Sequence, residues 1–171
     1  MTILALLHEG VPGRQAALIA ESGASRTALT QSLKHVEALG LIERNTCHGH
    51  PLRAEYVLTE AGRTVSGIAH RILRLPLVPA ESELLRRSWT LPILGTIGST
   101  GEGAYFREIL TGLAPITDRA LSQSLKSLEA QRWLTRQVVP DNRPPRVLYT
   151  PVATGAVIAE QLLVDQARMS R

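Results

Sequence analysis

One stretch of this chain occurs twice, and the repeat constrains the fold more than any other feature. Residues 28–38 read ALTQSLKHVEA and residues 120–130 read ALSQSLKSLEA, and the correspondence continues without a gap to Arg44 and Arg136. An internal repeat at a fixed spacing indicates structurally equivalent units. We therefore predict two similar small domains within the 171 residues.

A proline-containing segment separates the two copies. Pro76 and Pro79 cannot continue a helix, because proline lacks the backbone N–H and its ring clashes with the preceding turn. We predict a first domain over residues 1–75, a linker with a helix over residues 76–88, and a second domain over residues 89–171. Domains this small bury only about 60% of their unfolded surface, so we expect mutual support or a partner chain.

Composition limits the possible partners and compartment. The net charge of +4 and the pI of about 9.8 favour an anionic partner only mildly. No segment reaches the ~18 unbroken apolar residues of a membrane span, so we expect no membrane partner. The single cysteine, Cys47, excludes an intrachain disulfide, and the chain's apolar start lacks the basic region of a signal peptide. A reducing cytoplasm is the expected location.

Cap and turn residues divide the first copy into helices and a hairpin. Gly23 closes one helix and Ser25 caps the next, on which Leu29, Leu33, Val36 and Leu39 point inward at helical spacing. Gly40 ends that helix, and Thr59 caps the last one. The expected helices cover residues 1–7, 14–21, 26–39 and 60 toward 75, and the expected strands cover residues 41–44 and 54–58.

The second copy follows the same order. Thr117 caps its third helix, on which Leu121, Leu125 and Leu128 point inward, and the glycine-rich segment 98–103 is expected to be a flexible loop. The expected helices cover residues 80–87, 89–97, 106–113, 118–131 and 155 toward 169, and the expected strands cover 136–139 and 146–149.

Helix, helix, turn, helix and then a two-stranded hairpin make a winged helix-turn-helix. The predicted fold class is therefore mainly α with small β-hairpins (α+β), as tandem winged helix-turn-helix domains. In this fold the third helix can enter the DNA major groove while the hairpin, or wing, reaches the backbone beside it.

The outward face of each third helix carries side chains suited to DNA. Arginine can bond a guanine edge through two hydrogen bonds, glutamine can do so to adenine, and threonine and lysine reach bases or phosphates. A merely solvated helix face would look similar, but placement between a turn and a hairpin favours DNA contact. The candidate residues are Arg26, Thr27, Thr30, Gln31 and Lys34 with Arg44 and Arg53, and in the second copy Arg119, Ser122, Gln123 and Lys126 with Arg143 and Arg146.

Other constellations favour neither catalysis nor a cofactor. Residues 47–50 read Cys-His-Gly-His at the expected wing tip, without a fourth ligand nearby, and an exposed turn that touches DNA is the preferred interpretation. No nucleophile, base and orienting acid assemble, so we predict no enzyme, no metal and no cofactor. Trp89, Trp133 and Tyr105 either line an effector pocket or pack in the core, and core packing is favoured.

Several motifs of the second copy together resemble a known family. They are Trp89, Ile93-Leu94, Phe106-Arg107-Glu108-Ile109-Leu110, Ile116-Thr117, Leu121, Leu125, Leu128-Glu129, Arg136, Pro144-Pro145-Arg146-Val147-Leu148-Tyr149 and Gly155. On these residues the second copy resembles the HxlR-type winged-helix transcriptional regulators, relatives of the MarR group. The first copy carries the family-like ending Tyr56-Val57-Leu58-Thr59-Glu60-Ala61-Gly62, but its opening helix is short and lacks the tryptophan.

The resemblance implies differences as well as likenesses. Members of this family are usually single domains that form homodimers through their terminal helices, whereas this chain joins two copies. Asp118 replaces Arg26 at the start of the third helix, and Pro151 stands where the first copy has Leu58. These departures leave the second copy either a weaker DNA binder or mainly an assembly partner. The cysteine near the N-terminus that some members use for redox sensing is absent.

The predicted function is a sequence-specific regulator of transcription that binds double-stranded DNA with two winged helices as a pseudo-dimer. A homodimer through terminal or linker helices is the alternative assembly. Two other functions stay open: a tandem winged-helix factor of chromosome segregation that grips a protein, and a plasmid replication or partition protein that binds DNA. The basic pI disfavours the first of these.

Overall fold

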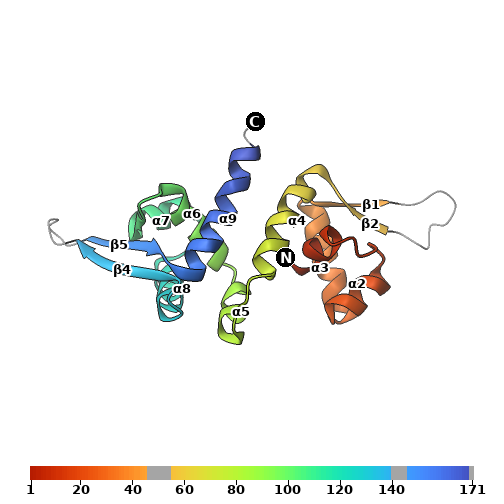
Figure 1. Cartoon of the computed structure of the whole chain (residues 1–171), viewed down its shortest axis with the longest axis horizontal. Coiled ribbons are helices and arrows are strands. Elements are labelled where there is room, and N and C mark those ends of the chain that lie inside the picture. Colours follow the sequence, from red (N-terminus) through yellow and green to blue (C-terminus); the bar gives the residue numbers. More distant parts are fainter. Residues whose placement is uncertain (46–54, 140–145, 170–171) are drawn as a thin grey trace. The chain divides into compact units, whose positions relative to one another are not determined.

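The chain forms two compact units in the computed structural model, residues 1–75 and residues 76–171 (Figure 1). The structure describes residues 1–45, 55–139 and 146–169, with only the backbone of residues 164–169. Helices dominate both units, and each unit has one small antiparallel sheet. The predicted fold class is confirmed.

The first unit has the expected order of helices and strands. Its elements are α1 (Thr2–His8), α2 (Gln15–Ser22), α3 (Arg26–Ala38), β1 (Ile42–Asn45), β2 (Glu55–Leu58) and α4 (Glu60–Leu73). Gly23 closes α2 in the left-handed conformation, with φ of 64°. The hydroxyl of Ser25 accepts a hydrogen bond from the Ala28 N–H, and that of Thr59 accepts one from the Gly62 N–H, so both predicted caps are confirmed.

The hairpin of the first unit is bonded to the loop before α2. Strands β1 and β2 pair in register Ile42↔Leu58 and Arg44↔Tyr56, and they extend away from the helical body (Figure 1). The Tyr56 N–H donates to the Gly13 carbonyl over 2.9 Å. Through this hydrogen bond Gly13 joins the loop before α2 to the outer edge of β2.

The core of the first unit lies between α1, α2, α3, α4 and the base of the hairpin. Leu18, Leu33 and Ile42 are almost completely buried there. The prediction that Leu39 points inward is wrong, since 58% of its surface is exposed. Leu39 is the C-cap of α3, and its N–H still bonds to the His35 carbonyl. At about 100° per residue, however, it lies about 80° around the helix from Leu29, at the edge of the inner face.

The second unit repeats this order and adds two elements. Its elements are α5 (Pro79–Leu85), α6 (Thr90–Thr100), β3 (Ala104–Tyr105), α7 (Phe106–Gly112), α8 (Asp118–Ala130), β4 (Leu134–Val139), β5 (Arg146–Pro151) and α9 (Ala153–Met169). The sheet has the order β3-β5-β4. Thr117 accepts a hydrogen bond from the Ala120 N–H, which confirms the predicted cap of α8. No helix in the described part of the chain has the length and apolar character needed to cross a membrane.

The glycine-rich segment before α7 is more ordered than the sequence indicates. Helix α6 continues to Thr100, whose hydroxyl oxygen lies 2.6 Å from the Ile97 carbonyl and 2.7 Å from the Gly103 carbonyl, so that the two carbonyls share its one proton. Residues Ala104 and Tyr105 then pair with Tyr149 and Leu148 of β5. The prediction of a flexible loop over residues 98–103 is therefore wrong at its beginning, and the third strand was not predicted.

One close contact recurs in both units where the helix after the wing passes the residue before the wing. A Cβ on Gly62 would overlap the Leu41 carbonyl, and a Cβ on Gly155 would overlap the Trp133 carbonyl. The same carbonyls accept hydrogen bonds from the N–H groups at the wing ends, Thr59 to Leu41 and Val152 to Trp133. Only glycine lets a helix come this close to the backbone.

Helix α5 is joined to the base of the second wing through a buried tryptophan. Trp133 is completely buried, and its indole N–H donates to Glu81 over 2.8 Å. The other carboxylate oxygen of Glu81, Oε2, accepts a hydrogen bond from the Val78 N–H. The Thr154 hydroxyl donates over 3.3 Å to Oε1, the oxygen that also accepts from Trp133. These hydrogen bonds to the ionised carboxylate hold the pKa of Glu81 below its ordinary value. The bond from Trp133 has the largest effect and the bond from Val78 the next largest.

A glycine-to-alanine pair tests the close contact in the second unit. Gly155→Ala should lower the free energy of unfolding by about 3 kcal/mol, the upper end of the cost of overpacking. Gly95→Ala in α6 is the matched control, because its Cβ would meet only a Leu162 methyl at 3.6 Å. Alanine gains up to about 1 kcal/mol over glycine within a helix, so this control should be stabilising. Chemical denaturation of both variants gives the comparison, and equal effects would contradict the close contact.

The Glu81 hydrogen bonds predict how the second unit responds to acid. A carboxylate whose pKa is lowered in the folded state stabilises the protein at pH values above its ordinary pKa of about 4.5. This stabilisation disappears as the pH falls through the lower pKa of the folded state. Glu81→Gln should therefore reduce the loss of melting temperature between about pH 7 and pH 3. Tryptophan fluorescence reports on this unit alone, since Trp89 and Trp133 are the two tryptophans of the chain.

The control for this experiment is Glu83→Gln, on the same helix, where the exposed carboxylate pairs only with Arg86 at 2.8 Å. Wild type and Glu83→Gln should show the same dependence on pH. A Glu81→Gln curve that parallels both would contradict a role for this carboxylate in joining α5 to the wing.

Candidate nucleic-acid interface

Helices α3 and α8 are placed by the same local interactions. Ser25 and Thr117 cap them at equivalent positions, and each hydroxyl accepts from the N–H three residues later at 3.2 Å. On the inner face of α3, Leu29 and Leu33 are equivalent to Leu121 and Leu125 of α8, and all four are buried. Because the inner faces match residue for residue, the outward faces also present equivalent positions.

The outward side chains of α3 are free to meet a ligand. Arg26, Thr27, Gln31 and Lys34 are exposed. Their side chains make no hydrogen bond or ion pair with the other described residues. Thr30 is half-buried, and its hydroxyl donates back to the Arg26 carbonyl over 2.8 Å, which occupies its proton. The structure thus brings four of the five predicted α3 residues together as available donors and acceptors.

The outward side chains of α8 form a comparable set. Arg119, Gln123 and Lys126 are exposed, and Ser122 is half-buried. At the next turn the Ser127 hydroxyl donates to the Gln123 carbonyl and accepts from Arg87 at 2.8 Å. Arg87 was not predicted, because its contact with α8 joins residues 40 positions apart in sequence.

The wings are described only in part. Arg44 is exposed on β1, opposite Tyr56 of β2. Arg53, Arg143 and the Cys-His-Gly-His segment at residues 47–50 lie outside the described residues. Among the described residues, no group of three or more His, Cys, Asp or Glu side chains could hold a metal ion.

Arg146 is held at the outer end of the described part of the second wing, where it pairs with Val139 of β4. Its guanidinium carbon lies 3.9 Å from the centre of the Tyr105 ring, and its Nη2 lies 3.8 Å from Glu108. Glu108 in turn accepts a hydrogen bond from the Tyr105 N–H over 2.8 Å. A cation over an aromatic face is attracted by the ring's negative face. The contact fixes Arg146 beside the first turn of α7.

Tyr105 is a residue that the sequence assigned to another role. It was expected in the core or at an effector pocket, together with Trp133, which does pack in the core. Tyr105 is only half-buried, and strand pairing with Leu148 of β5 places it next to the wing. A two-residue strand has too little periodicity to be recognised in sequence, so nothing indicated this position.

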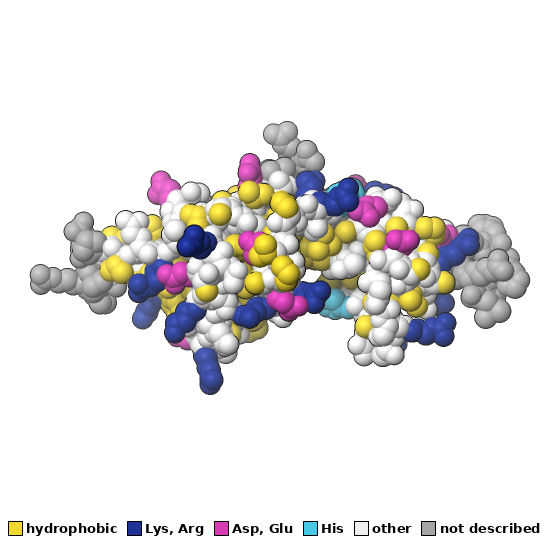
Figure 2. Space-filling model, turned by 60° about the horizontal axis from the view of Figure 1, so that its bottom comes forward, with side chains coloured by type: hydrophobic (Ala, Val, Ile, Leu, Met, Phe, Trp, Pro, Cys, Tyr) yellow, Lys and Arg dark blue, Asp and Glu magenta, His cyan; other side chains and the backbone are white. Residues whose placement is uncertain are grey.

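Positive charge is distributed rather than concentrated. In the view of Figure 2, Lys and Arg side chains lie scattered over both units, with acidic side chains among them. This pattern agrees with the modest net charge of +4. Any recognition of DNA must therefore come from the local arrangement on α3, α8 and the wings.

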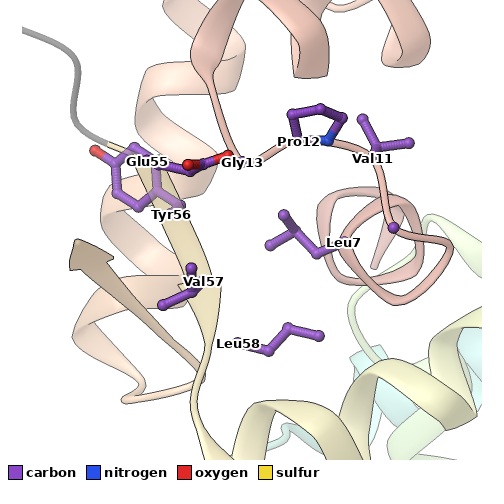
Figure 3. A pocket seen from close by; sticks show the side chains of 9 residues that line it. Leu7, Val11, Pro12, Gly13, Glu55, Tyr56, Val57 and Leu58 are labelled. Atoms are coloured by element: carbon purple, nitrogen blue, oxygen red, sulfur yellow. The ribbon is translucent and has the colours of Figure 1, made fainter. Parts of the chain in front are cut away.

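A groove of about 250 Å³ lies beside β2 in the first unit (Figure 3). Leu7, Val11 and Pro12 line it on one side, and Tyr56 and Leu58 of β2 on the other. In the second unit, β3 covers the equivalent edge of the sheet by pairing with β5. The groove is smaller than the roughly 300–1,000 Å³ of typical ligand pockets, and we assign no ligand to it.

Comparison with known proteins identifies the family. The model of the HxlR-like helix-turn-helix family matches the chain in two segments, residues 1–75 and 84–167. No curated protein matches the chain significantly.

Three solved structures are similar to one part of the chain. Diamide-treated YodB from B. subtilis has 28% identity and a TM-score of 0.43, covering 56% of this chain and 94% of its own. The reduced form of the transcriptional regulator YodB has 26% identity and a TM-score of 0.43, covering 55% and 89%. A MarR-family protein from Porphyromonas gingivalis W83 has 19% identity and a TM-score of 0.42, covering 56% and 89%.

The family match extends over nearly the whole chain, and each of its two segments contains one of the helices with free outward side chains. The chain belongs to the HxlR-like helix-turn-helix family and is a DNA-binding transcriptional regulator with two such segments.

Proposed function

We propose that this protein binds a specific DNA sequence with both winged helices of one chain, which act as a pseudo-dimer. The observation that carries the proposal is the equivalence of α3 and α8. Both have the same cap and the same buried leucines, and both present a free glutamine and lysine at matching positions, Gln31 with Lys34 and Gln123 with Lys126.

The chemistry of these faces suits the major groove. A recognition helix contacts base edges mainly through its N-terminal residues, where Arg26 and Arg119 lie. Gln31 and Gln123 can each form two hydrogen bonds to an adenine edge. Thr27, Thr30 and Ser122 add short polar groups, and Lys34 and Lys126 reach phosphates or bases.

The wing arginines supply contacts to the backbone. Arg44 and Arg53 of the first wing and Arg143 and Arg146 of the second are proposed to neutralise phosphates beside each groove. Such contacts fix orientation without reading sequence. We infer that α3 and α8 select the site while the wings hold the protein on it.

Each winged helix, with α3 or α8 as its recognition helix, is one DNA-binding head. Two heads in one chain predict the spacing of the two half-sites on DNA. Paired recognition helices usually read half-sites one helical turn apart, about 34–36 Å or 10–10.5 base pairs. A pseudo-dimer would fill such a site with a single chain. A homodimer through terminal or linker helices would instead place four heads on the DNA, and the mass of the complex separates these assemblies.

Paired substitutions test whether both heads bind DNA. Gln31→Ala with Lys34→Ala should weaken binding to the chain's own site by about ten- to a hundredfold, as for the loss of one base-reading pair and one phosphate contact. Gln123→Ala with Lys126→Ala should do the same in the second head. Fluorescence anisotropy at several salt concentrations, with scrambled competitor, measures both effects.

Arg63→Ala is the control for charge, because it removes one exposed positive charge from α4, which is neither of the recognition helices. Full affinity after the change in α3 would contradict the DNA-binding assignment. Loss in α3 alone, with full affinity after the change in α8, would contradict the pseudo-dimer.

The Tyr105 ring gives a second test, directed at the wing. Tyr105→Leu removes the aromatic face under Arg146, whereas Tyr105→Phe keeps it. A cation–π contact at an exposed site contributes about 0.5–1 kcal/mol, so Tyr105→Leu should weaken DNA binding about two- to fivefold, with a shallower salt dependence. Tyr105→Phe should bind like wild type. Equal affinity of the two variants would show that the position of Arg146 does not matter for binding.

A further inference from the structure

We infer that the two heads read different bases at one position, so that the DNA site of a single chain is asymmetric. The inference rests on the proposed function and adds the residues that set specificity. Arg26 and Asp118 are the residues concerned. They begin α3 and α8 directly after the capping residues Ser25 and Thr117.

The positions are equivalent because both helices start from the same cap. In each, the capping hydroxyl accepts a hydrogen bond from the N–H three residues later, Ala28 or Ala120. The next buried side chains, Leu29 and Leu121, also match. Arg26 and Asp118 therefore leave the first turn in the same direction relative to their own unit.

Their hydrogen-bonding chemistry is opposite. Arginine has only donors and an ionised aspartate has only acceptors. In the major groove the donors suit the O6 and N7 acceptors of guanine, and the acceptors suit the N4 donor of cytosine. Arg26 and Asp118 are both exposed, and neither side chain bonds to another described residue. Where the first head selects guanine, the second should select cytosine.

The following position differs as well. Thr27 of α3 corresponds to Arg119 of α8. One residue along a helix turns the side chain by about 100° and moves it about 1.5 Å. The arginine of the second head thus approaches the groove from another angle than Arg26, and it does not replace the lost guanine contact at the same base.

The rest of the reading face is shared. Gln31 matches Gln123, and Lys34 matches Lys126, with the same exposure in both helices. The two half-sites should therefore share a common core and differ at the base pairs read by the first turn. Two identical chains would carry identical recognition helices and read equal half-sites, whereas the fused copies are free to differ.

Asp118 also has a structural role that must be separated from reading. A carboxylate in the first turn interacts favourably with the helix dipole, by about 0.3–1 kcal/mol. That contribution is the same whatever base pair faces the helix. Base preference, and not affinity alone, is thus the quantity that distinguishes the two roles.

The experiment selects sites for the full-length chain from random double-stranded DNA, with the mass of the complex fixing the number of chains. We expect two half-sites per chain with a common core, one carrying guanine and the other cytosine at the position of the first turn. Symmetric duplexes built from either half-site alone should bind about five- to a hundredfold more weakly than the selected site.

Asp118→Arg then converts the second head to the residue of the first. This variant should lose the preference for cytosine and bind best to the symmetric duplex that carries guanine twice. Arg26→Asp should show the reverse shift. Glu102→Arg is the control for charge, because Glu102 is exposed in the turn before β3 and lies on neither recognition helix.

The possible results distinguish a failure of this inference from a failure of the proposed sequence-specific DNA binding. Binding that vanishes with competitor for every sequence would overturn the proposed function, and the inference with it. A selected site with two equal half-sites would overturn the inference alone. So would an Asp118→Arg protein that binds tightly with unchanged base preference, since the carboxylate would then act only on the helix.

Discussion

The close approach of a helix to a backbone carbonyl at the base of each wing is the constraint on which both units depend. Gly62 passes the Leu41 carbonyl and Gly155 passes the Trp133 carbonyl at distances that no side chain tolerates. The same carbonyls also receive the N–H groups that end the wings. Recognition helix, wing and following helix therefore meet at one point, which fixes the wing relative to the helix beside it.

The repeat itself predicted much of this architecture, because caps and buried leucines act locally. Elements whose stability comes from distant partners were harder to predict. Strand β3 exists through pairing with β5, and the contact of α5 depends on a hydrogen bond between Glu81 and Trp133. The repeat even overrides local preference: Arg132 adopts a φ of 57° where the first copy has Gly40 at 69°.

The candidate site also has a part that local sequence predicts and a part that depends on distant partners. The outward side chains of α3 and α8 follow from helical spacing once the inner face is known, and the structure shows all of them exposed except Thr30 and Ser122, which are half-buried. The surroundings of Arg146 do not follow from spacing, since Tyr105 and Glu108 reach it only through the fold. The two copies share their caps, their buried leucines and the outward Gln and Lys, but they differ in the first residue of the helix, which is Arg26 in α3 and Asp118 in α8.

In the proposed complex, one chain places two heads on DNA. Hydroxyl-radical footprinting of the full-length protein on its selected duplex, at a stoichiometry fixed by the mass of the complex, tests it directly. A single bound chain should protect two windows about 10–10.5 base pairs apart on one face of the duplex. A single protected window per chain, with a second appearing only when a second chain binds, would contradict it.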